Sequence, residues 1–150
     1  MAATDVLDYL PETYSGREAL LSKLRALLSE LPKWADPQTG MWYQVLDCPG
    51  REGNYLEATS CAMFTYVFLK SVRLGYIDAG LESYALGLYD SLVKTFVSTD
   101  DQGRISLEKC CSVGGLGGGK RYRMGDYAYY LSEPVRPNDS KGIGPFIWAS

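Results

Sequence analysis

A loop that is rich in aromatic and polar side chains precedes a strongly apolar segment and is the part of the chain best suited to bind a small polar ligand. Its candidate binding residues are Trp42, Tyr43, Gln44, Asn54, Tyr55 and Glu57. Flat apolar rings beside amides and carboxylates suit a sugar, which presents C–H faces and a fringe of hydroxyl groups. The residue types therefore favour a carbohydrate site. A turn that packs Trp42 over the core fits the same residues, and this alternative stays open.

The composition excludes several kinds of catalysis. The chain has no histidine, so it cannot form a Ser-His or Cys-His nucleophilic pair or a histidine zinc site. Its cysteines lack a CxxC pair, which predicts free thiols and no metal site. Residues 113–119 (VGGLGGG) form a glycine-rich loop, but Lys120 is not followed by the Ser or Thr of a phosphate-binding loop. Any acid–base chemistry must use carboxylates, tyrosines or lysines.

Charge and hydropathy exclude other partners. A net charge of −3 gives no basic surface for nucleic acid, and Lys120, Arg121 and Arg123 are too short a cluster to change this. The first residues form no signal-peptide pattern, and the apolar segment is shorter than the ~20 residues that a membrane span needs. We therefore expect a cytoplasmic protein that binds neither nucleic acid nor membranes.

The helices that position the loop differ in character. Asn54 and Glu57 have the spacing of a capping box and predict the start of a helix that is apolar on nearly all sides through Leu69. Ser15 and Glu18 predict a second capping box, followed by leucines on one face only. A third helix after Ile77 repeats this one-sided pattern. Buried inner helices and one-sided outer helices together predict helical hairpins arranged in a barrel or solenoid.

The last third of the chain is less regular. Residues 104–112 fit a short strand or a helical turn, and Pro145 predicts the first turn of a helix that scarcely begins before Ser150. The first residues likewise resemble a connection from an earlier element. The sequence therefore predicts a part of a larger fold.

Three segments, GMWYQVLD, NYLEATSCAMFTYVFLKSVRLGYI and YYLSEPVRPNDSKGIGPFIWAS, carry a family resemblance. In order and spacing they resemble the C-terminal part of the unsaturated rhamnogalacturonyl hydrolases, glycoside hydrolase family 105, which is related to the unsaturated glucuronyl hydrolases of family 88. The resemblance runs from about Val6 to the C-terminus. It covers nearly all of this chain but only the last part of a usual family member.

The resemblance implies an all-α fold, in which residues 1–150 form the last hairpins of an incomplete (α/α)6 toroid with no second domain. It implies hydrolysis of pectin-derived disaccharides that carry a 4,5-unsaturated uronic acid. In the family an aspartic acid protonates the C4=C5 bond, water adds at C5, and the hemiketal rearranges to release the neighbouring sugar, without metal or organic cofactor. The KGIGPF ending adds Lys141 to the candidate binding residues, and Gly114–Gly119 would line the same barrel wall.

The family's catalytic aspartate, and the residues around the uronate, lie in the earlier part of the fold. No aspartate of this chain matches that motif, Asp47 and Asp126 included, so we assign no catalytic residue. We expect the chain alone to be inactive and to line one side of the sugar pocket together with a missing N-terminal half. It could self-associate through its open face. The alternative is a non-catalytic helical module that binds a carbohydrate or a protein.

Overall fold

A computed structural model describes residues 1–118 and 122–150; Gly119, Lys120 and Arg121, where the glycine-rich loop ends, lie outside the described residues. The α-helices are α1 (Ala2–Val6), α2 (Arg17–Glu30), α3 (Ala58–Arg73), α4 (Glu82–Phe96), α5 (Tyr127–Ser132) and α6 (Ser140–Ala149). Two 3-10 helices are η1 (Leu31–Trp34) and η2 (Ala79–Leu81). The strands are β1 (Val97–Thr99), β2 (Ile105–Leu107), β3 (Cys110–Cys111) and β4 (Val135–Arg136). None of the described helices is long and apolar enough to cross a membrane.

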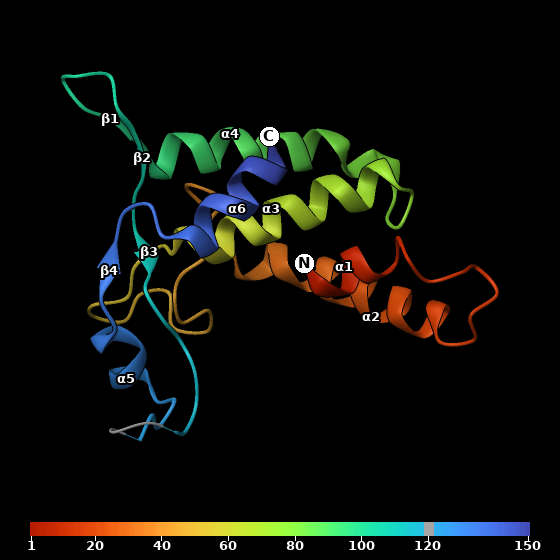
Figure 1. Cartoon of the computed structure of the whole chain (residues 1–150), viewed down its shortest axis with the longest axis horizontal. Coiled ribbons are helices and arrows are strands. Elements are labelled where there is room, and N and C mark those ends of the chain that lie inside the picture. Colours follow the sequence, from red (N-terminus) through yellow and green to blue (C-terminus); the bar gives the residue numbers. More distant parts are fainter. Residues whose placement is uncertain (119–121) are drawn as a thin grey trace.

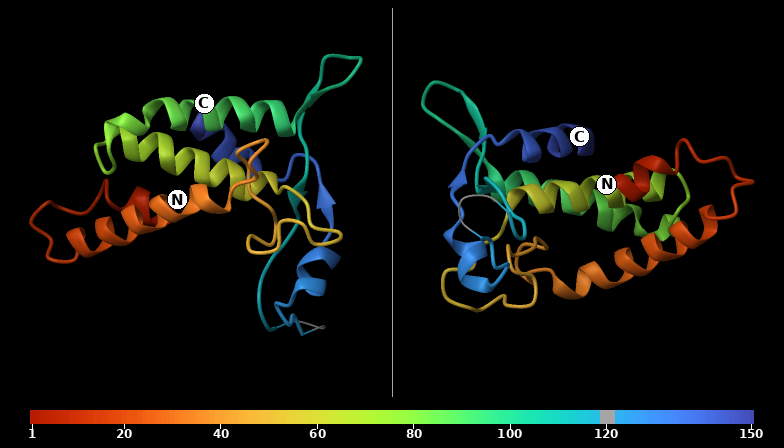
Figure 2. Two further views of the ribbon diagram at one scale, coloured as in Figure 1. Left: turned by 180° about the vertical axis from the view of Figure 1, so that it is seen from behind. Right: turned by 60° about the horizontal axis from the view of Figure 1, so that its bottom comes forward.

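Helix α3 lies in the middle of the molecule (Figure 1). It packs against α6, which runs in the same direction, and against α4, which runs in the opposite direction. Helix α2 covers another side of α3 and also runs opposite to it, as both views of Figure 2 show. The N-terminal ends of α3 and α6 therefore lie at the same end of the molecule, beside β3 and β4.

The burial of α3 confirms the prediction of an inner helix. Its buried positions lie on several faces and include the small residues Ala58, Cys61 and Ala62 as well as Phe68. A helix can be apolar nearly all round only when protein surrounds it. Helices α2 and α4 instead bury one face: in α2, Leu21, Leu24 and Leu28 are buried while Leu27 is exposed. The predicted division into inner and outer helices is confirmed.

The predicted capping box at the start of α2 is wrong. The helix begins at Arg17 with Gly16 as its N-cap, and no side chain caps it. Ser15 therefore lies outside the helix, one residue too early to reach its free N–H groups. Glu18 pairs with Arg25 instead, at 3.0 Å on the exposed face.

The prediction that a helix begins at Pro145 is also wrong. Helix α6 begins at Ser140 because the Asp139 side chain caps it, accepting from the N–H of Lys141 at 3.0 Å. Pro145 lies inside the helix and cannot donate a hydrogen bond to an earlier carbonyl. The capping aspartate thus moves the start of the helix five residues ahead of the proline.

Helix α6 packs closely against α3 and β3 at Gly142. A Cβ atom on Gly142 of α6 would lie 2.9 Å from Cys110 Sγ in β3 and 3.2 Å from Thr59 Oγ1 in α3. Real side chains do not tolerate the first of these distances, so glycine is required at this position for the observed packing.

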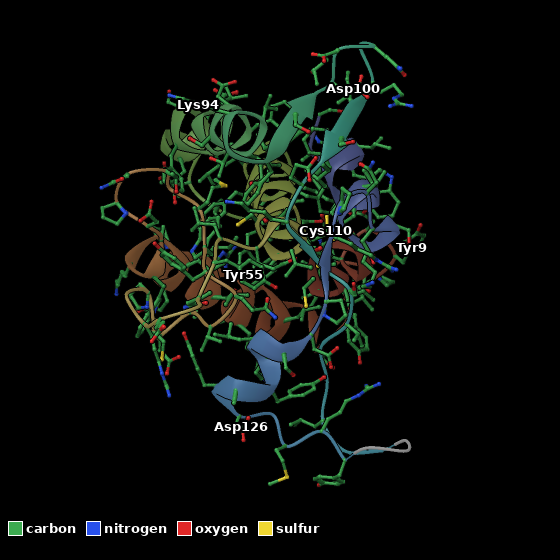
Figure 3. The ribbon with its side chains drawn as sticks, turned by 90° about the vertical axis from the view of Figure 1, so that its left-hand side faces the viewer. Tyr9, Tyr55, Lys94, Asp100, Cys110 and Asp126 are labelled. Atoms are coloured by element: carbon green, nitrogen blue, oxygen red, sulfur yellow. The ribbon has the colours of Figure 1, made fainter. Side chains whose placement is uncertain are left out.

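Two small antiparallel ribbons flank the helices. Strands β1 and β2 form a hairpin that projects from the body, with Asp100 at its tip (Figure 3). Strand β3 pairs with β4, so that Cys110 lies opposite Arg136 and Cys111 opposite Val135. Of the two forms predicted for residues 104–112, the structure has the strand. The second ribbon joins the chain before and after the glycine-rich loop to the N-terminal ends of α3 and α6.

Candidate functional site

Asn54 holds the predicted binding loop together. Its side-chain amide donates to the carbonyls of Val45 at 2.9 Å and Cys48 at 2.7 Å, and its oxygen accepts from the N–H of Val45 at 3.2 Å. Asn54 is therefore not the N-cap of α3, contrary to the prediction. Because its donors and acceptor already bind the loop, its contribution here is to the loop's shape.

Glu57 is the N-cap of α3, a position that the sequence assigned to Asn54. Its carboxylate is buried and accepts from the N–H groups of Thr59 at 2.9 Å and Ser60 at 2.6 Å. It also accepts from the N–H of Cys111 in β3, at 2.9 Å. Glu57 thus caps the helix itself, instead of reaching back as the third residue of a capping box that begins at Asn54. Glu57 consequently ties the inner helix to the β3–β4 ribbon.

Trp42 is a core residue. Its side chain is 0% exposed, its indole N–H donates to the carbonyl of Leu31 at 2.8 Å, and its ring meets Phe64 edge-on at 5.1 Å. A completely buried ring with a satisfied donor cannot stack on a sugar. The structure thus supports the core alternative, and we withdraw Trp42 from the candidate binding residues.

Tyr43 lies close to Asp36, which precedes a turn. Its hydroxyl is 3.4 Å from Asp36 Oδ1. Burial, followed by the negative charge of Asp36, raises the pKa of Tyr43 above its usual value. The hydroxyl therefore stays protonated at neutral pH and acts as a hydrogen-bonding group rather than as a base.

The remaining candidates converge on Cys111 and Ser112. Gln44 Nε2 is 3.4 Å from Cys111 Sγ, Glu57 accepts from the Cys111 N–H, and Lys141 Nζ donates to the Ser112 carbonyl at 2.8 Å. Tyr55 also lies here: burial, followed by the neighbouring Cys111, raises its pKa. Within the described residues, the Tyr55 hydroxyl and Ser112 Oγ are buried without a hydrogen-bond partner. Such unpaired polar atoms are uncommon in folded proteins.

The four cysteines are free thiols. Burial raises the pKa of Cys61 and of Cys110, so both remain protonated at neutral pH. The Cys61 thiol donates weakly to the Trp42 carbonyl, at 3.4 Å. Over residues 1–118 and 122–150 there is no group of three or more side chains suited to hold a metal ion. Cys61 and Cys110 are thus packed in the core.

Sequence reasoning missed Arg136 and Asp139. Asp139 has a fully buried side chain, and both oxygens bind cations: Oδ2 accepts from Arg136 and Oδ1 from Lys141. These charges hold the pKa of Asp139 well below its usual range. One signal could have located it, since an aspartate before Ser140 and Lys141 is a common helix N-cap.

The comparison with known proteins decides the family. A family model described as Glycosyl Hydrolase Family 88 matches residues 1–150. This chain belongs to glycosyl hydrolase family 88. Two curated relatives support the assignment, each 38% identical over 154 residues: Protein Atu3128 of Agrobacterium fabrum and the 24.9 kDa protein in the picA locus of Rhizobium radiobacter.

Solved structures show the fold of this family 88 chain. A family 105 glycoside hydrolase of C. acetobutylicum is 44% identical and superimposes with a TM-score of 0.95. A possible family 105 member from Klebsiella pneumoniae is 26% identical, with a TM-score of 0.75. The predicted family resemblance and the predicted all-α toroid are both confirmed.

The family 88 chain is shorter than these proteins. It spans 65% of the length of each curated relative, 41% of the C. acetobutylicum chain and 35% of the Klebsiella chain, while 99% of its own length is matched in each case. The chain therefore holds an incomplete part of the toroid, in agreement with the prediction.

Proposed function

We propose that this chain forms one wall of the sugar pocket of a glycoside hydrolase that acts on pectin-derived disaccharides with a 4,5-unsaturated uronic acid. The convergence of Gln44, Tyr55, Glu57 and Lys141 beside the β3–β4 ribbon, at the N-terminal ends of α3 and α6, supports this proposal. Family membership favours the hydrolase over the alternative, a non-catalytic binding module.

In this proposal the roles of the side chains differ. Gln44 offers an amide for hydrogen bonds to sugar hydroxyls, and Lys141 offers a positive charge. The Tyr55 hydroxyl is buried, so Tyr55 supports the wall rather than contacting the sugar. Tyr43 offers a further protonated hydroxyl, while Asn54 and Glu57 hold the loop and the start of α3 in place. Protonation of the C4=C5 bond, addition of water at C5 and release of the neighbouring sugar are left to groups outside this chain.

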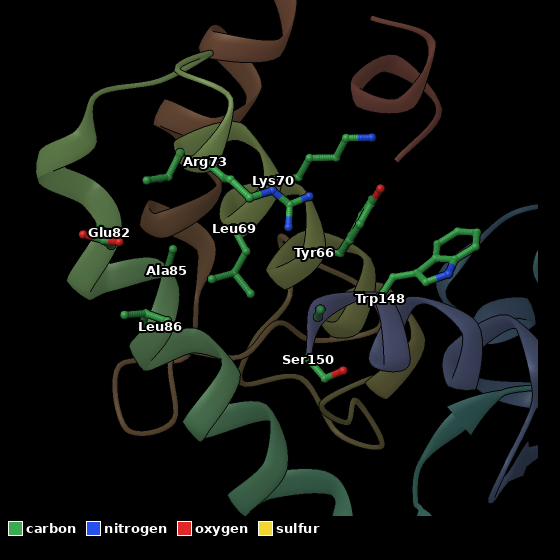
Figure 4. A pocket seen from close by; sticks show the side chains of 11 residues that line it. Tyr66, Leu69, Lys70, Arg73, Glu82, Ala85, Leu86, Trp148 and Ser150 are labelled. Atoms are coloured by element: carbon green, nitrogen blue, oxygen red, sulfur yellow. The ribbon is translucent and has the colours of Figure 1, made fainter. Parts of the chain in front are cut away.

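An open apolar surface at the C-terminal end of α3 supports the proposal that other helices join this chain. A hollow of about 310 Å³ lies there between α3, α4 and α6 (Figure 4). Around it Leu86 is 55% exposed and Trp148 62%, and Ile147 beside it is also exposed. Apolar side chains gathered in this way mark a surface that other protein covers. We propose that the remaining helices of the toroid cover it, and that the isolated chain self-associates through it.

An activity assay tests the catalytic part of the proposal. We expect the chain alone, incubated with an unsaturated rhamnogalacturonan disaccharide, to leave the ultraviolet absorbance of the C4=C5 bond unchanged, because an enzyme stabilises a transition state only with groups that it possesses. A loss of absorbance above the buffer rate that heating abolishes would contradict this expectation.

A chimera tests the pocket wall. The chain would replace the matching segment of the C. acetobutylicum protein, whose structure is superimposable on it. We expect the chimera to retain whatever activity its parent has on the disaccharide, and Gln44→Ala to raise its KM about tenfold, as the loss of one hydrogen bond to a substrate does. The exposed Gln102→Ala in the distant hairpin is the matched control. Equal KM values for both variants would refute the assignment of Gln44.

Size-exclusion chromatography with light scattering, beside a dye that binds apolar surface, tests the open face. We expect species larger than the chain mass of 16.6 kDa, or a monomer that binds the dye. A sharp monomer that binds no dye and unfolds cooperatively would show that the chain needs no covering partner.

A further inference from the structure

Helix α5 lies against the binding loop without entering the core. None of its 6 residues, all of which belong to the described part of the chain, is buried. Figure 3 shows it directly after the labelled Asp126, below the loop that carries Tyr55. An isolated helix shorter than about 12 residues is marginal in water. The position of α5 therefore depends on the contacts that it makes at its surface.

The C-terminal end of α5 is fixed to the β3–β4 ribbon. The N–H of Ser112, directly after β3, donates to the carbonyl of Pro134 at 2.9 Å. Cys111 pairs with Val135 in the next step of the ribbon, and its N–H donates to the buried carboxylate of Glu57. Backbone hydrogen bonds thus connect this end of α5 to the start of α3.

The N-terminal end of α5 is attached to the binding loop by Tyr127. Its hydroxyl donates to the carbonyl of Glu52 at 2.8 Å and lies 3.1 Å from the carbonyl of Arg51. The guanidinium of Arg51 lies over the Tyr127 ring, 3.8 Å from its centroid. These contacts are exposed, so water competes for each of them and the attachment is weak.

Glycines on both sides of this contact suit a segment that moves. Gly125, directly before the N-cap of α5, has a φ of 70°, a conformation that glycine adopts without steric cost. In the loop, Gly53 has a φ of 81°, and a Cβ atom there would lie 3.2 Å from Leu131 Cδ1 in α5. The loop therefore accepts α5 closely, while the chain that leads into α5 changes direction at little cost.

We infer that α5 is a movable cover, which turns about Pro134 and closes on the binding loop when Tyr127 binds residues 51–52. One fixed end and one weakly attached end allow a segment to open while the rest of the protein stays folded. When closed, α5 bridges the loop and the ribbon beside which Gln44 lies. A ligand that contacts both favours the closed form. The identity of that ligand as a sugar rests on the proposed function, but the movement does not.

Native-state hydrogen exchange of the 150-residue chain, followed by NMR, tests the movement. The reporter is the Tyr130 N–H, which donates to the Asp126 carbonyl at 3.1 Å. We expect low concentrations of urea to leave its exchange rate unchanged, as local opening requires, and to accelerate exchange in α3. Exchange of α5 in parallel with α3, or as fast as in an unfolded chain, would overturn the inference.

Variants of Tyr127 test the attachment. Tyr127→Phe keeps the ring over Arg51 but removes the hydroxyl, and we expect exchange in α5 to become about threefold faster. Tyr127→Ala removes both contacts, and we expect an increase of at least about tenfold. Exchange in α3 should not change. Tyr9→Ala is the matched control, because Tyr9 is 85% exposed and belongs to another part of the chain. Unchanged exchange of α5 in Tyr127→Ala would overturn the inference.

The chimera with the C. acetobutylicum protein tests whether the cover closes on substrate. We expect Tyr127→Ala to raise the KM at least about threefold with little change in kcat, because the closed form binds the ligand more tightly. An unchanged KM would refute closure on the ligand. An inactive chimera in which the Tyr127 variants still accelerate exchange in α5 would support the movement and refute only the proposed reaction.

Discussion

The two ends of α3 bury opposite charges in different ways. At the N-terminal end the Glu57 carboxylate accepts from three backbone N–H groups, those of Thr59, Ser60 and Cys111. At the C-terminal end the Lys70 ammonium meets the side chains of Asp5 at 2.8 Å and Asp8 at 2.6 Å. Each charge has the sign that the helix dipole favours at its end.

The difference lies in what neutralises each charge. Backbone donors of a helix and a strand cannot move away without unfolding those elements, whereas Asp5 and Asp8 belong to the short α1 and its C-terminal extension and are about a third exposed. We therefore expect the N-terminal end to be the rigid one. This is also the end where the candidate binding residues converge.

The largest expected effect follows from removing the charge at the rigid end. Glu57→Ala deletes the cap of α3, which costs about 1 kcal/mol, and leaves the buried Cys111 N–H unpaired, which costs about 2 kcal/mol more. We expect urea denaturation to show a free energy of unfolding lower by about 3 kcal/mol. Glu30→Ala on the exposed face of α2 is the control. A free-energy loss smaller than that caused by Lys70→Met, which removes the charge at the other end of α3, would reverse the comparison.

A smaller effect is expected at the other end. Lys70→Met keeps most of the side-chain volume but removes the charge, and the partly exposed Asp5 and Asp8 can then be solvated by water. We expect a loss of about 1 to 2 kcal/mol in the same assay. Lys33→Met, in the exposed pair with Glu30, should have almost no effect. If Lys33→Met cost as much as Lys70→Met, burial of the pair would not be the cause.

The two ends also differ in how their contribution to stability depends on pH. Hydrogen bonds from Lys141 and Arg136 hold the pKa of Asp139 below its usual value, so the ionised form stabilises the fold above about pH 4 and loses this effect as the pH falls through the lower folded pKa. The pKa of Lys70 is raised despite its desolvation by burial, because Asp5, Asp8 and Tyr66 bind its ammonium. Its stabilisation is complete below about pH 10.5 and is lost above.

We therefore expect Asp139→Asn, which still caps α6, to flatten the acid side of the stability curve and to leave the alkaline side unchanged. Lys70→Met should do the opposite. Thermal unfolding followed by circular dichroism from pH 2 to pH 11 would record both curves, with an effect of about 1 kcal/mol at each extreme. Identical acid sides for the parent and Asp139→Asn would refute the assigned role of this carboxylate.

The smallest effect is expected in the projecting hairpin. Arg104 pairs with Asp100 at 2.6 Å, but both side chains are exposed. Exposed ion pairs contribute about 0 to 1 kcal/mol. We expect Arg104→Ala to change the free energy of unfolding by less than about 0.5 kcal/mol, and the change to vanish in high salt. A loss as large as that of Lys70→Met would mean that exposure does not separate these pairs.

The helical part of the fold was predictable because burial leaves a local pattern. The apolar residues on all sides of α3 and the leucines on one side of α2 can be read from spacing alone. The starts of the helices were not, because Ser15, Asn54 and Pro145 all permit a start that their neighbours override. A cap is decided by which side chain reaches the free N–H groups in three dimensions.

The contacts of the candidate binding residues were only partly predictable from the sequence, and their role in binding stays a prediction. Gln44, Tyr55 and Lys141 converge as the residue types suggested, whereas Trp42 fills the core and Asn54 braces its own loop. Whether an aromatic ring faces a ligand or the core depends on contacts with residues far away in the sequence. Arg136 and Asp139 were missed for the same reason, since only the return of the chain along β4 brings them to the site.

Gly142 bears on the size of the ring that such hairpins form. The missing Cβ lets α6 lie directly against Thr59 of α3 and Cys110 of β3, so it sets the distance between α3 and α6. In a closed ring with a set number of members, that distance also determines the radius of the central opening. An alanine at this position would widen the spacing of one pair by only a few tenths of an ångström, yet every other pair would have to adjust for the circle to remain closed.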